Sequence, residues 1–297
     1  MLKLFTDTDT DVDLEIAKKY GYNLISMPYS IEGKIIYPYV DFQKFEGHKF
    51  YESLRNGILP STSGLNMDEY IAYFEPIFQA GDDILYVHFS SKMSSTFNNM
   101  NLAINELKEK YPERKFYTID TKGITILSYL ICLEIGKMYQ EGKSIEEILA
   151  FADKEVLHYG LYFYADNLKF FKRSGRVNGI SAFMGDILGI HPIIFIDNNG
   201  LMRSIGKERG RNRSLRKLAL AVKKYGKDLQ NHKIVIGHTD AIELANSLKE
   251  MLLAEIDDSL DIELVLVNPT AGCHCGPDGI GVAFYCTERK ESLNDWS

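Results

Sequence analysis

Short apolar runs alternate with stretches in which apolar residues recur every three or four positions, and this alternation dominates the first half of the chain. The apolar runs predict strands at residues 2–5, 24–29, 84–89 and 116–119. The helical spacing predicts a helix at residues 14–20 and further helices after the strands at 84–89 and 116–119. This order of strands and helices favours a mainly parallel sheet, whose ligands lie outside the carboxyl ends of the strands.

Polar loops follow three of these predicted strands, beginning at Asp7-Thr8, Ser90 and Asp120-Thr121. Parallel strands end at the same edge of a sheet, so we expect the three loops to share one rim.

The pattern changes near Tyr159. Strand-like runs follow at residues 161–164, 192–196, 201–205, 233–236, 263–267 and 282–285, with helices at 168–173, from about 212, and at 243–254. Asp197 to Gly200 reads as a hairpin turn. We therefore expect an α/β protein of two domains. Residues 1–158 would carry a mainly parallel sheet with flanking helices, and residues 159–297 a mixed or antiparallel sheet, with the ligand between them.

The run from Ser90 to Thr96 places five hydroxyls between a buried strand and a helix that begins near Phe97. The first turn of a helix has free N–H groups and the positive end of the helix dipole. Hydroxyls at that junction would complete a site for a carboxylate or phosphate. Ordinary capping by Ser94 or Ser95 is the competing interpretation, although capping needs only one hydroxyl.

A second hydroxyl-rich loop contains Thr62 and Ser63 and precedes another helical pattern. Asn66 and Glu69 have the spacing of a capping box, so the two hydroxyls are not needed to cap that helix. They are available to a ligand, unless the segment is an ordinary polar loop.

Between two late strand-like runs, residues 272–281 are rich in glycine and predict a tight turn that a ligand approaches closely. His274 on this turn would donate to an anion or shuttle a proton, unless it is simply exposed. Cys273, His274 and Cys275 also suggest metal binding. Structural zinc needs four ligands, however, and the other cysteines, at 132 and 286, fall in apolar runs. We expect no metal.

The composition argues against nucleic acid and membranes as partners. The 297 residues carry 34 Lys and Arg against 41 Asp and Glu, a formal net charge of −7, which argues against non-specific binding to nucleic acid or anionic membranes. No apolar run approaches the ~20 residues of a membrane span, so we expect no integral membrane segment. The start of the chain runs directly into Asp7, Asp9, Asp11 and Asp13, unlike a signal peptide, and we expect a cytoplasmic protein.

Basic residues gather in two segments, 169–176 and 203–217, which include Arg176 and Arg209. A solvated helix face explains such a run equally well as an acidic partner or a phosphate.

Six segments, taken in order, resemble the DegV family of fatty-acid-binding proteins over most of the chain. They are Thr6 to Thr8, Thr62-Ser63, Ser90 to Thr96, Asp120-Thr121, Leu168 to Arg176, and His274 to Pro277. The resemblance implies a two-domain α/β fold that holds one long-chain fatty acid, such as palmitate or stearate, in an apolar tunnel, without a cofactor.

The resemblance also assigns residues. The carboxylate would bind Thr62, Ser63, Ser94, Ser95, His274 and Gly276. Family members linked to fatty acid kinase have the bound carboxylate phosphorylated by a separate ATP-binding subunit, and this resemblance places His274 and Arg209 near the head group and the kinase contact. Arg176 is a further candidate for phosphate or partner contact.

Three residues stand where the family pattern has glycine. They are Ser95, Ser174 and Asp278. Ser95 would either add a hydroxyl to the site or crowd the approach of the ligand. Asp278 would raise the pKa of His274 or repel a bound anion.

An enzyme is the alternative function. Ser94 or Thr62 would act as nucleophile and His274 as base, to hydrolyse or transfer an acyl or phosphoryl group. No G-x-S-x-G elbow, complete phosphate loop or clear orienting third residue supports this reading. A metal-binding regulator that uses the Cys-His-Cys run is a third hypothesis.

Overall fold

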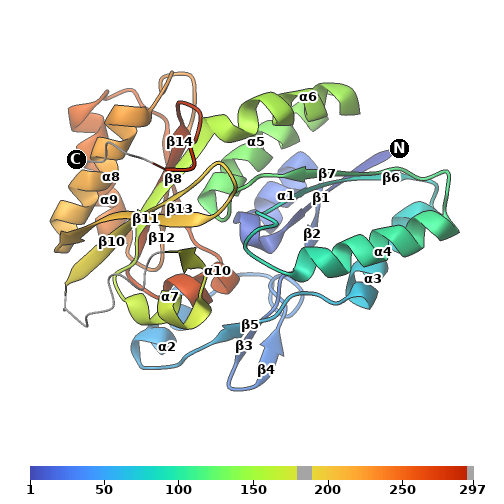
Figure 1. The fold of residues 1–297 in the computed structure, drawn as a ribbon, viewed down its shortest axis with the longest axis horizontal. Coiled ribbons are helices and arrows are strands. Elements are labelled where there is room, and N and C mark those ends of the chain that lie inside the picture. Colours follow the sequence, from blue (N-terminus) through green and yellow to red (C-terminus); the bar gives the residue numbers. More distant parts are fainter. Residues whose placement is uncertain (179–188, 293–297) are drawn as a thin grey trace.

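The computed structural model describes residues 1–178 and 189–292, which form two large β-sheets side by side (Figure 1). The first sheet is parallel, with strand order β2-β1-β6-β7. These strands cover Tyr22–Ile25, Leu2–Asp7, Asp83–His88 and Phe116–Asp120. Five α-helices accompany them: α1 (Leu14–Tyr20), α3 (Met67–Gln79), α4 (Thr96–Lys110), α5 (Ile126–Gln140) and α6 (Ile145–Glu155). Figure 1 shows α3 and α4 on one side of the sheet and α5 and α6 on the other.

The second sheet is mixed, as the sequence predicts. Its order is β13-β12-β14-β8-β10-β11-β9, with parallel pairs only at its two ends. In chain order the strands are β8 (Tyr159–Tyr164), β9 (Val177–Asn178), β10 (Ile190–Ile196), β11 (Met202–Arg209), β12 (Ile234–His238), β13 (Ile262–Leu266) and β14 (Ile280–Tyr285). Helices α8 (Arg211–Tyr225) and α9 (Ile242–Glu255) pack on one face.

Alternation along β8 separates the cores on the two faces of this sheet. Tyr162 and Tyr164 belong to the core under α8 and α9, whereas Leu161 and Phe163 belong to the core that continues through α5 into the first sheet. Successive side chains of a strand point to opposite faces, so one strand serves both cores.

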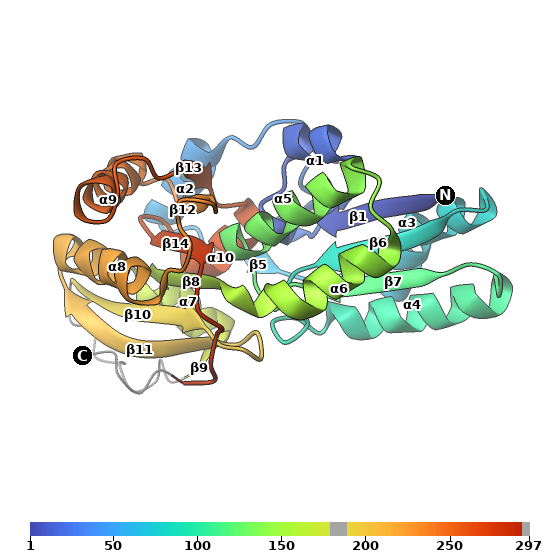
Figure 2. The same cartoon turned by 90° about the horizontal axis from the view of Figure 1, so that it is seen from above.

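The start of α5 joins the two sheets (Figure 2). Ile126 is buried against β12 and β14, where glycines replace side chains. A Cβ on Gly237 would lie 2.9 Å from Cγ2 of Ile126, and one on Gly281 would lie 3.6 Å from its Cδ1. Glycine in a strand therefore gives the helix room to approach the sheet.

A small third sheet lies beside this junction. Its order is β4-β3-β5, with strands Lys34–Ile36, Tyr29–Ile31 and Ser61–Thr62. Helices α2 (Gly47–Arg55), α7 (Leu168–Ser174) and α10 (Pro269–Cys275) gather around an aromatic core of Tyr29, Phe50, Tyr51 and Phe170. Tyr51 donates from its hydroxyl to the carbonyl of Val267 at 2.9 Å, which links the first half of the chain to the second. The remaining elements are two 3-10 helices, η1 (Thr8–Thr10) and η2 (Val156–His158).

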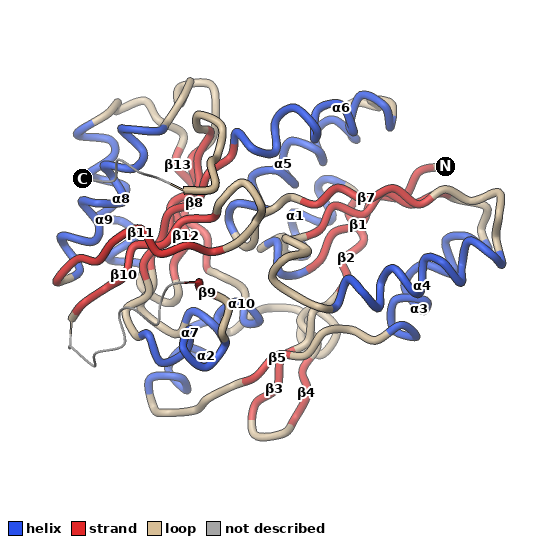
Figure 3. Tube along the Cα trace, viewed as in Figure 1, coloured by secondary structure: helices blue, strands red, loops and turns tan. Residues whose placement is uncertain are grey.

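The fold class is confirmed, with one strand corrected. The single strand predicted over 24–29 is wrong, because β2 ends at Ile25 and β3 begins at Tyr29 in another sheet (Figure 3). Pro28 lacks an N–H, and Ser26 donates its hydroxyl to the carbonyl of Pro38 at 2.7 Å, so this segment turns away. The domain boundary at residue 158 stays a prediction, since α5 also packs on the second sheet.

Within the described ranges, no helix combines the length and the apolar character that crossing a membrane requires.

Arg289 ties loops of both sheets together from a buried position. Its Nη1 donates to the carbonyls of Lys122 at 2.6 Å and Asp197 at 3.2 Å. Its Nη2 donates to the carbonyls of Thr121 and Val156. Burial holds the pKa of the guanidinium down at about 10, below its usual range.

We expect Arg289→Met to lower the free energy of unfolding by about 2–4 kcal/mol, because several buried carbonyls lose their donor. Urea denaturation followed by circular dichroism measures the loss. Lys290→Met, at the exposed neighbouring position, is the control and leaves stability within about 0.5 kcal/mol. Equal stability of the two variants would show that Arg289 does not hold the loops together.

Candidate functional site

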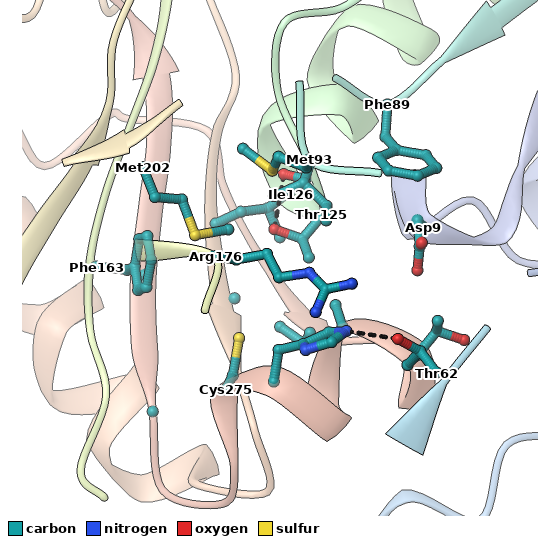
Figure 4. A pocket seen from close by; sticks show the side chains of 18 of the residues that line it. Asp9, Thr62, Phe89, Met93, Thr125, Ile126, Phe163, Arg176, Met202 and Cys275 are labelled. Atoms are coloured by element: carbon teal, nitrogen blue, oxygen red, sulfur yellow. Dashed lines mark hydrogen bonds between the residues drawn. The ribbon is translucent and has the colours of Figure 1, made fainter. Parts of the chain in front are cut away.

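A cavity of about 240 Å³ lies at the junction of the two sheets, and the third sheet and α10 complete its wall (Figure 4). Its polar wall residues are Asp9, Thr62, Ser63, Ser94, Ser95, Thr125, Tyr164, Arg176, Thr239, Thr270 and His274. Its larger apolar residues are Met27, Phe89, Met93, Ile124, Ile126, Leu161, Phe163, Met202, Val267 and Ile280. A largely apolar cavity with a few converging polar groups is typical of a small-molecule site.

The three polar loops lie on one rim of the first sheet, as the sequence predicts. Asp7 accepts hydrogen bonds from the N–H of Phe89 at 3.2 Å and the hydroxyl of Tyr86 at 3.0 Å. Asp120 accepts from the N–H of Ser91 at 3.2 Å and from its hydroxyl at 2.6 Å. The carboxylates of Asp7 and Asp120, at the ends of β1 and β7, therefore hold the loop that follows β6 in place.

Three of the five hydroxyls in that loop serve the fold. Besides the bond between Ser91 and Asp120, Ser90 donates to the carbonyl of Gly200 at 2.8 Å and connects the loop to the β10–β11 turn. Thr96 bonds the hydroxyl of Tyr70 at 3.0 Å. These side chains have structural partners and are not free for a ligand.

Ser94 and Ser95 are the two hydroxyl residues of the loop that line the cavity. Ser94 accepts from the N–H of Thr96 at 3.2 Å. Ser95 is the N-cap of α4 but makes no capping bond with its side chain, so its hydroxyl is available. Its φ of −75° is ordinary, and serine at this position needs no strained backbone.

Thr62 and His274 meet in the cavity wall. Oγ1 of Thr62, on β5, lies 2.9 Å from Nε2 of His274, on α10, and the dashed line in Figure 4 marks this bond. Ser63 follows Thr62 in the same wall. Residues 212 positions apart in the sequence therefore form one polar group.

The tight turn predicted over 272–281 is wrong for its first part, which is helix α10. Asn268 caps this helix by accepting from the N–H of Ala271 at 2.9 Å, and Pro269 occupies the first turn. Asp11 holds the cap by accepting from the side-chain amide of Asn268 at 2.7 Å. An Asn-Pro pair is a helix-start signal that was readable in the sequence.

His274 is held neutral by its surroundings. Burial, and to a smaller extent the positive charge of Arg176, lowers the pKa of its imidazole to about 4. The expectation that Asp278 raises this pKa is wrong. Asp278 instead pairs with Arg55 at 2.9 Å and occupies a left-handed backbone position, with φ of 64°.

Arg176 lines the cavity, and its guanidinium extends into the space between Asp9 and Thr62 (Figure 4). Arg209 lies at the end of β11, is exposed, and is not part of the cavity wall. Ser174, the third departure from the family pattern, donates from its hydroxyl to the carbonyl of Phe171 at 3.0 Å within α7. It serves the helix rather than the cavity.

Gly276 is also absent from the cavity wall. Its N–H donates to the carbonyl of Gly272 at 2.8 Å, so it is not free for a ligand. The residue has φ of 72°, and a Cβ there would collide with the ring of Phe170. Its glycine is explained by backbone conformation and close packing.

Asp9 lines the cavity, although in the sequence it is only one of the acidic run Asp7, Asp9, Asp11 and Asp13. It sits in η1, directly after β1, with 6% of its surface exposed. Burial raises the pKa of its carboxyl well above the usual range, and the charges of Asp7 and Asp11 raise it further. The sequence signal for a polar site here was the alternation of Asp residues directly after a buried strand.

The Cys-His-Cys run does not assemble a metal site. Cys273 packs into the aromatic core beside α2, whereas His274 faces the cavity, because neighbouring residues of a helix point in different directions. Among residues 1–178 and 189–292, no three His, Cys, Asp or Glu side chains are grouped as metal ligands. In the same part of the chain, no carboxylate bonds the imidazole of His274, which a catalytic triad would require.

Comparison with known proteins identifies the family of the chain. A family model described as "Uncharacterised protein, DegV family" matches residues 1–287. The chain belongs to the DegV family. A DegV domain-containing protein of Clostridium perfringens is 30% identical to it over 288 residues, covering 97% of this chain and 98% of that one.

Solved DegV structures share the fold. A DegV family protein from Thermus thermophilus, described as fatty acid binding, superposes with a TM-score of 0.84 and 21% identity, covering 96% of this chain and 99% of that one. A DegV family protein from Eubacterium eligens, loaded with heptadecanoic acid, gives a TM-score of 0.80 and 21% identity, covering 97% and 100%.

Gly276→Ala and Gly175→Ala form a matched pair, because both glycines have left-handed backbone, with φ of 72° and 67°. Only the Cβ at position 276 would meet the ring of Phe170, while position 175 has open space. We expect Gly175→Ala to cost about 1 kcal/mol of unfolding free energy, and Gly276→Ala about 1–3 kcal/mol more. Thermal denaturation compares them, and equal losses would remove the packing argument.

Proposed function

We propose that this DegV-family protein binds a long-chain fatty acid, such as palmitate or stearate, in the cavity between its sheets. The observation that carries the proposal is the division of the cavity into a cluster of hydroxyls and basic groups and a larger apolar surface. The fatty acid binding described for the T. thermophilus protein and the heptadecanoic acid in the E. eligens structure support the same ligand class.

The energetics suit a fatty acid. Burial of about fifteen methylene groups at ~0.8 kcal/mol each contributes on the order of 10 kcal/mol before ordering costs. Met93, Phe163 and Met202 supply apolar surface for the chain. Methionine adapts its shape to a flexible ligand.

The carboxylate loses water on binding, so several donors must replace that water. We propose Thr62, Ser94 and Ser95 as hydroxyl donors, with Ser63 and His274 beside them. Arg176 supplies the positive charge. Gly276 stays outside the proposed contact set, because its N–H is already bonded.

We also propose that a separate ATP-binding kinase subunit phosphorylates the bound carboxylate. Arg209 would lie on the surface that docks this subunit, and His274 would lie near the reacting carboxylate. The exposure of Arg209 and the exposed position of Arg176 at the cavity support contact with an acidic partner.

Native and denaturing mass spectra of the purified protein test the ligand. We expect a stoichiometric adduct that leaves on denaturation and is identified as a fatty acid after organic extraction. No adduct, together with no binding of added palmitate, would contradict the proposal. Turnover of acyl esters or acyl phosphates would favour the hydrolase or transferase instead.

Thr62→Val and Ser94→Ala should each weaken palmitate binding by about 1–3 kcal/mol, because a buried carboxylate loses a donor. Fluorescence competition measures the dissociation constant. Thr118→Val, on the exposed face of β7, is the control for Thr62 and leaves binding unchanged. Unchanged affinity in both cavity variants would remove Thr62 and Ser94 from the site.

His274→Ala should reduce phosphate transfer by a partner kinase more than it reduces palmitate binding. The readout is the rate of acyl phosphate formation at saturating palmitate, set against the dissociation constant. Equal loss of both would place the imidazole on the carboxylate itself.

A further inference from the structure

Asp9 is a buried carboxyl in the wall of the cavity. Its Oδ1 is buried without a hydrogen bond in the described part of the chain, although the residue lines the cavity. The backbone around it is held firmly. Its N–H donates to Asp7 at 3.0 Å, and its carbonyl accepts from the N–H of Thr125 at 2.7 Å. The backbone is therefore fixed, and the side chain lies at the cavity with its Oδ1 unbonded among the described residues (Figure 4).

The groups that face Asp9 set its charge. Asp7 and Asp11 lie on the same turn, and Arg176 approaches from the segment after α7. Cys273 and Cys275 on α10 have raised pKa values, as do Tyr70 on α3 and Tyr86 on β6. His274 on α10 has a lowered pKa. Near neutral pH these cysteines, tyrosines and the histidine are uncharged, which leaves Arg176 as the cation acting on Asp9 among the described residues.

A fatty acid brings a second carboxyl to this cation. Two carboxylates in one desolvated site repel each other, so one of them keeps a proton, as in paired catalytic carboxyls. The carboxylate bound near Thr62 gains from Arg176 and from the hydroxyls. Asp9 shares the charge of Arg176, but its buried Oδ1 has no hydrogen-bond donor among the described residues. Protonation there turns an unsatisfied acceptor into a hydrogen-bond donor.

We propose that Asp9 carries a proton in the ligand complex and donates it in a hydrogen bond to the bound carboxylate, so that the protein takes up its ligand as a carboxylate plus one proton. This rests on the proposed function. Asp9 is then a specificity residue for a carboxylate head group, because a head group without an acceptor leaves the Asp9 hydroxyl unpaired in a buried site. The proton comes from the solvent and forms the O–H bond of Asp9, and no covalent bond of the ligand forms or breaks.

Dodecanoate titrated calorimetrically into the delipidated full-length protein tests this between pH 6 and pH 10. Measurements in buffers of different ionisation enthalpy give the number of protons taken up. We expect uptake to rise toward one proton per ligand as the pH exceeds the pKa of Asp9 in the empty protein. Above that pH the dissociation constant should increase about tenfold per pH unit.

Asp9→Asn keeps a neutral donor and removes the titrating group. We expect it to bind dodecanoate without proton uptake and to keep its affinity at high pH. Asp13→Asn is the control, because Asp13 lies outside the cavity wall and is not among the charges that act on Asp9. Its side chain caps α1 by accepting from the N–H of Ile16 at 2.9 Å, a role that asparagine fills equally well. This variant should retain the proton uptake of the wild type. If Asp9→Asn does not fold, Asp9→Ser removes the carboxyl in the same way.

The outcomes separate the two proposals. Dodecanoate binding without proton uptake at any pH overturns the role of Asp9 and leaves the fatty acid function standing. Uptake that persists in Asp9→Asn and Asp9→Ser also overturns it and moves the proton to His274. Absence of binding of both dodecanoate and palmitate overturns the fatty acid function and this inference together.

Discussion

The contact between the start of α5 and the second sheet is the constraint on which the rest of the structure depends. Ile126 reaches the sheet because Gly237 and Gly281 leave space on β12 and β14. This contact sets the distance between the sheets, and the cavity occupies the space beside it, with Ile126, Gly237 and Gly281 all in its wall. Larger side chains on either strand would part the sheets or fill the cavity, since protein interiors tolerate little overlap.

Polar groups at this junction divide into those that hold the fold and those left for a ligand. The side chains of Asp7, Asp120 and Ser90 form hydrogen bonds with neighbouring loops. Among the described residues, no donor meets the buried Oδ1 of Asp9, which lines the cavity. The exposed hydroxyl of Ser95, also at the cavity, makes no capping bond. Buried polar groups are normally satisfied, so unsatisfied ones that face a cavity identify a functional surface rather than a defect.

The family assignment and the site geometry carry different weight. The match over residues 1–287 establishes the family, and the solved structures establish the fold. Which atoms would contact the proposed ligand depends on this chain's own residues. Asp278 illustrates the point, because an acid close to His274 in sequence pairs with Arg55 on α2 and leaves the imidazole neutral.

The sequence by itself determined the fold class, most strands and helices, and the hydroxyl loops, because these depend on local periodicity and on capping patterns such as Asn66 with Glu69. It did not separate Ser90 and Thr96, which bond other segments, from Ser94 and Ser95, which line the cavity. Only the tertiary structure decided which hydroxyls line the cavity. It alone also decided that Thr62 pairs with His274 and that Oδ1 of Asp9 has no hydrogen bond among the described residues. The physical reason is that hydrogen-bond partners, burial and nearby charge come from segments distant in the chain, and periodicity carries no information about them.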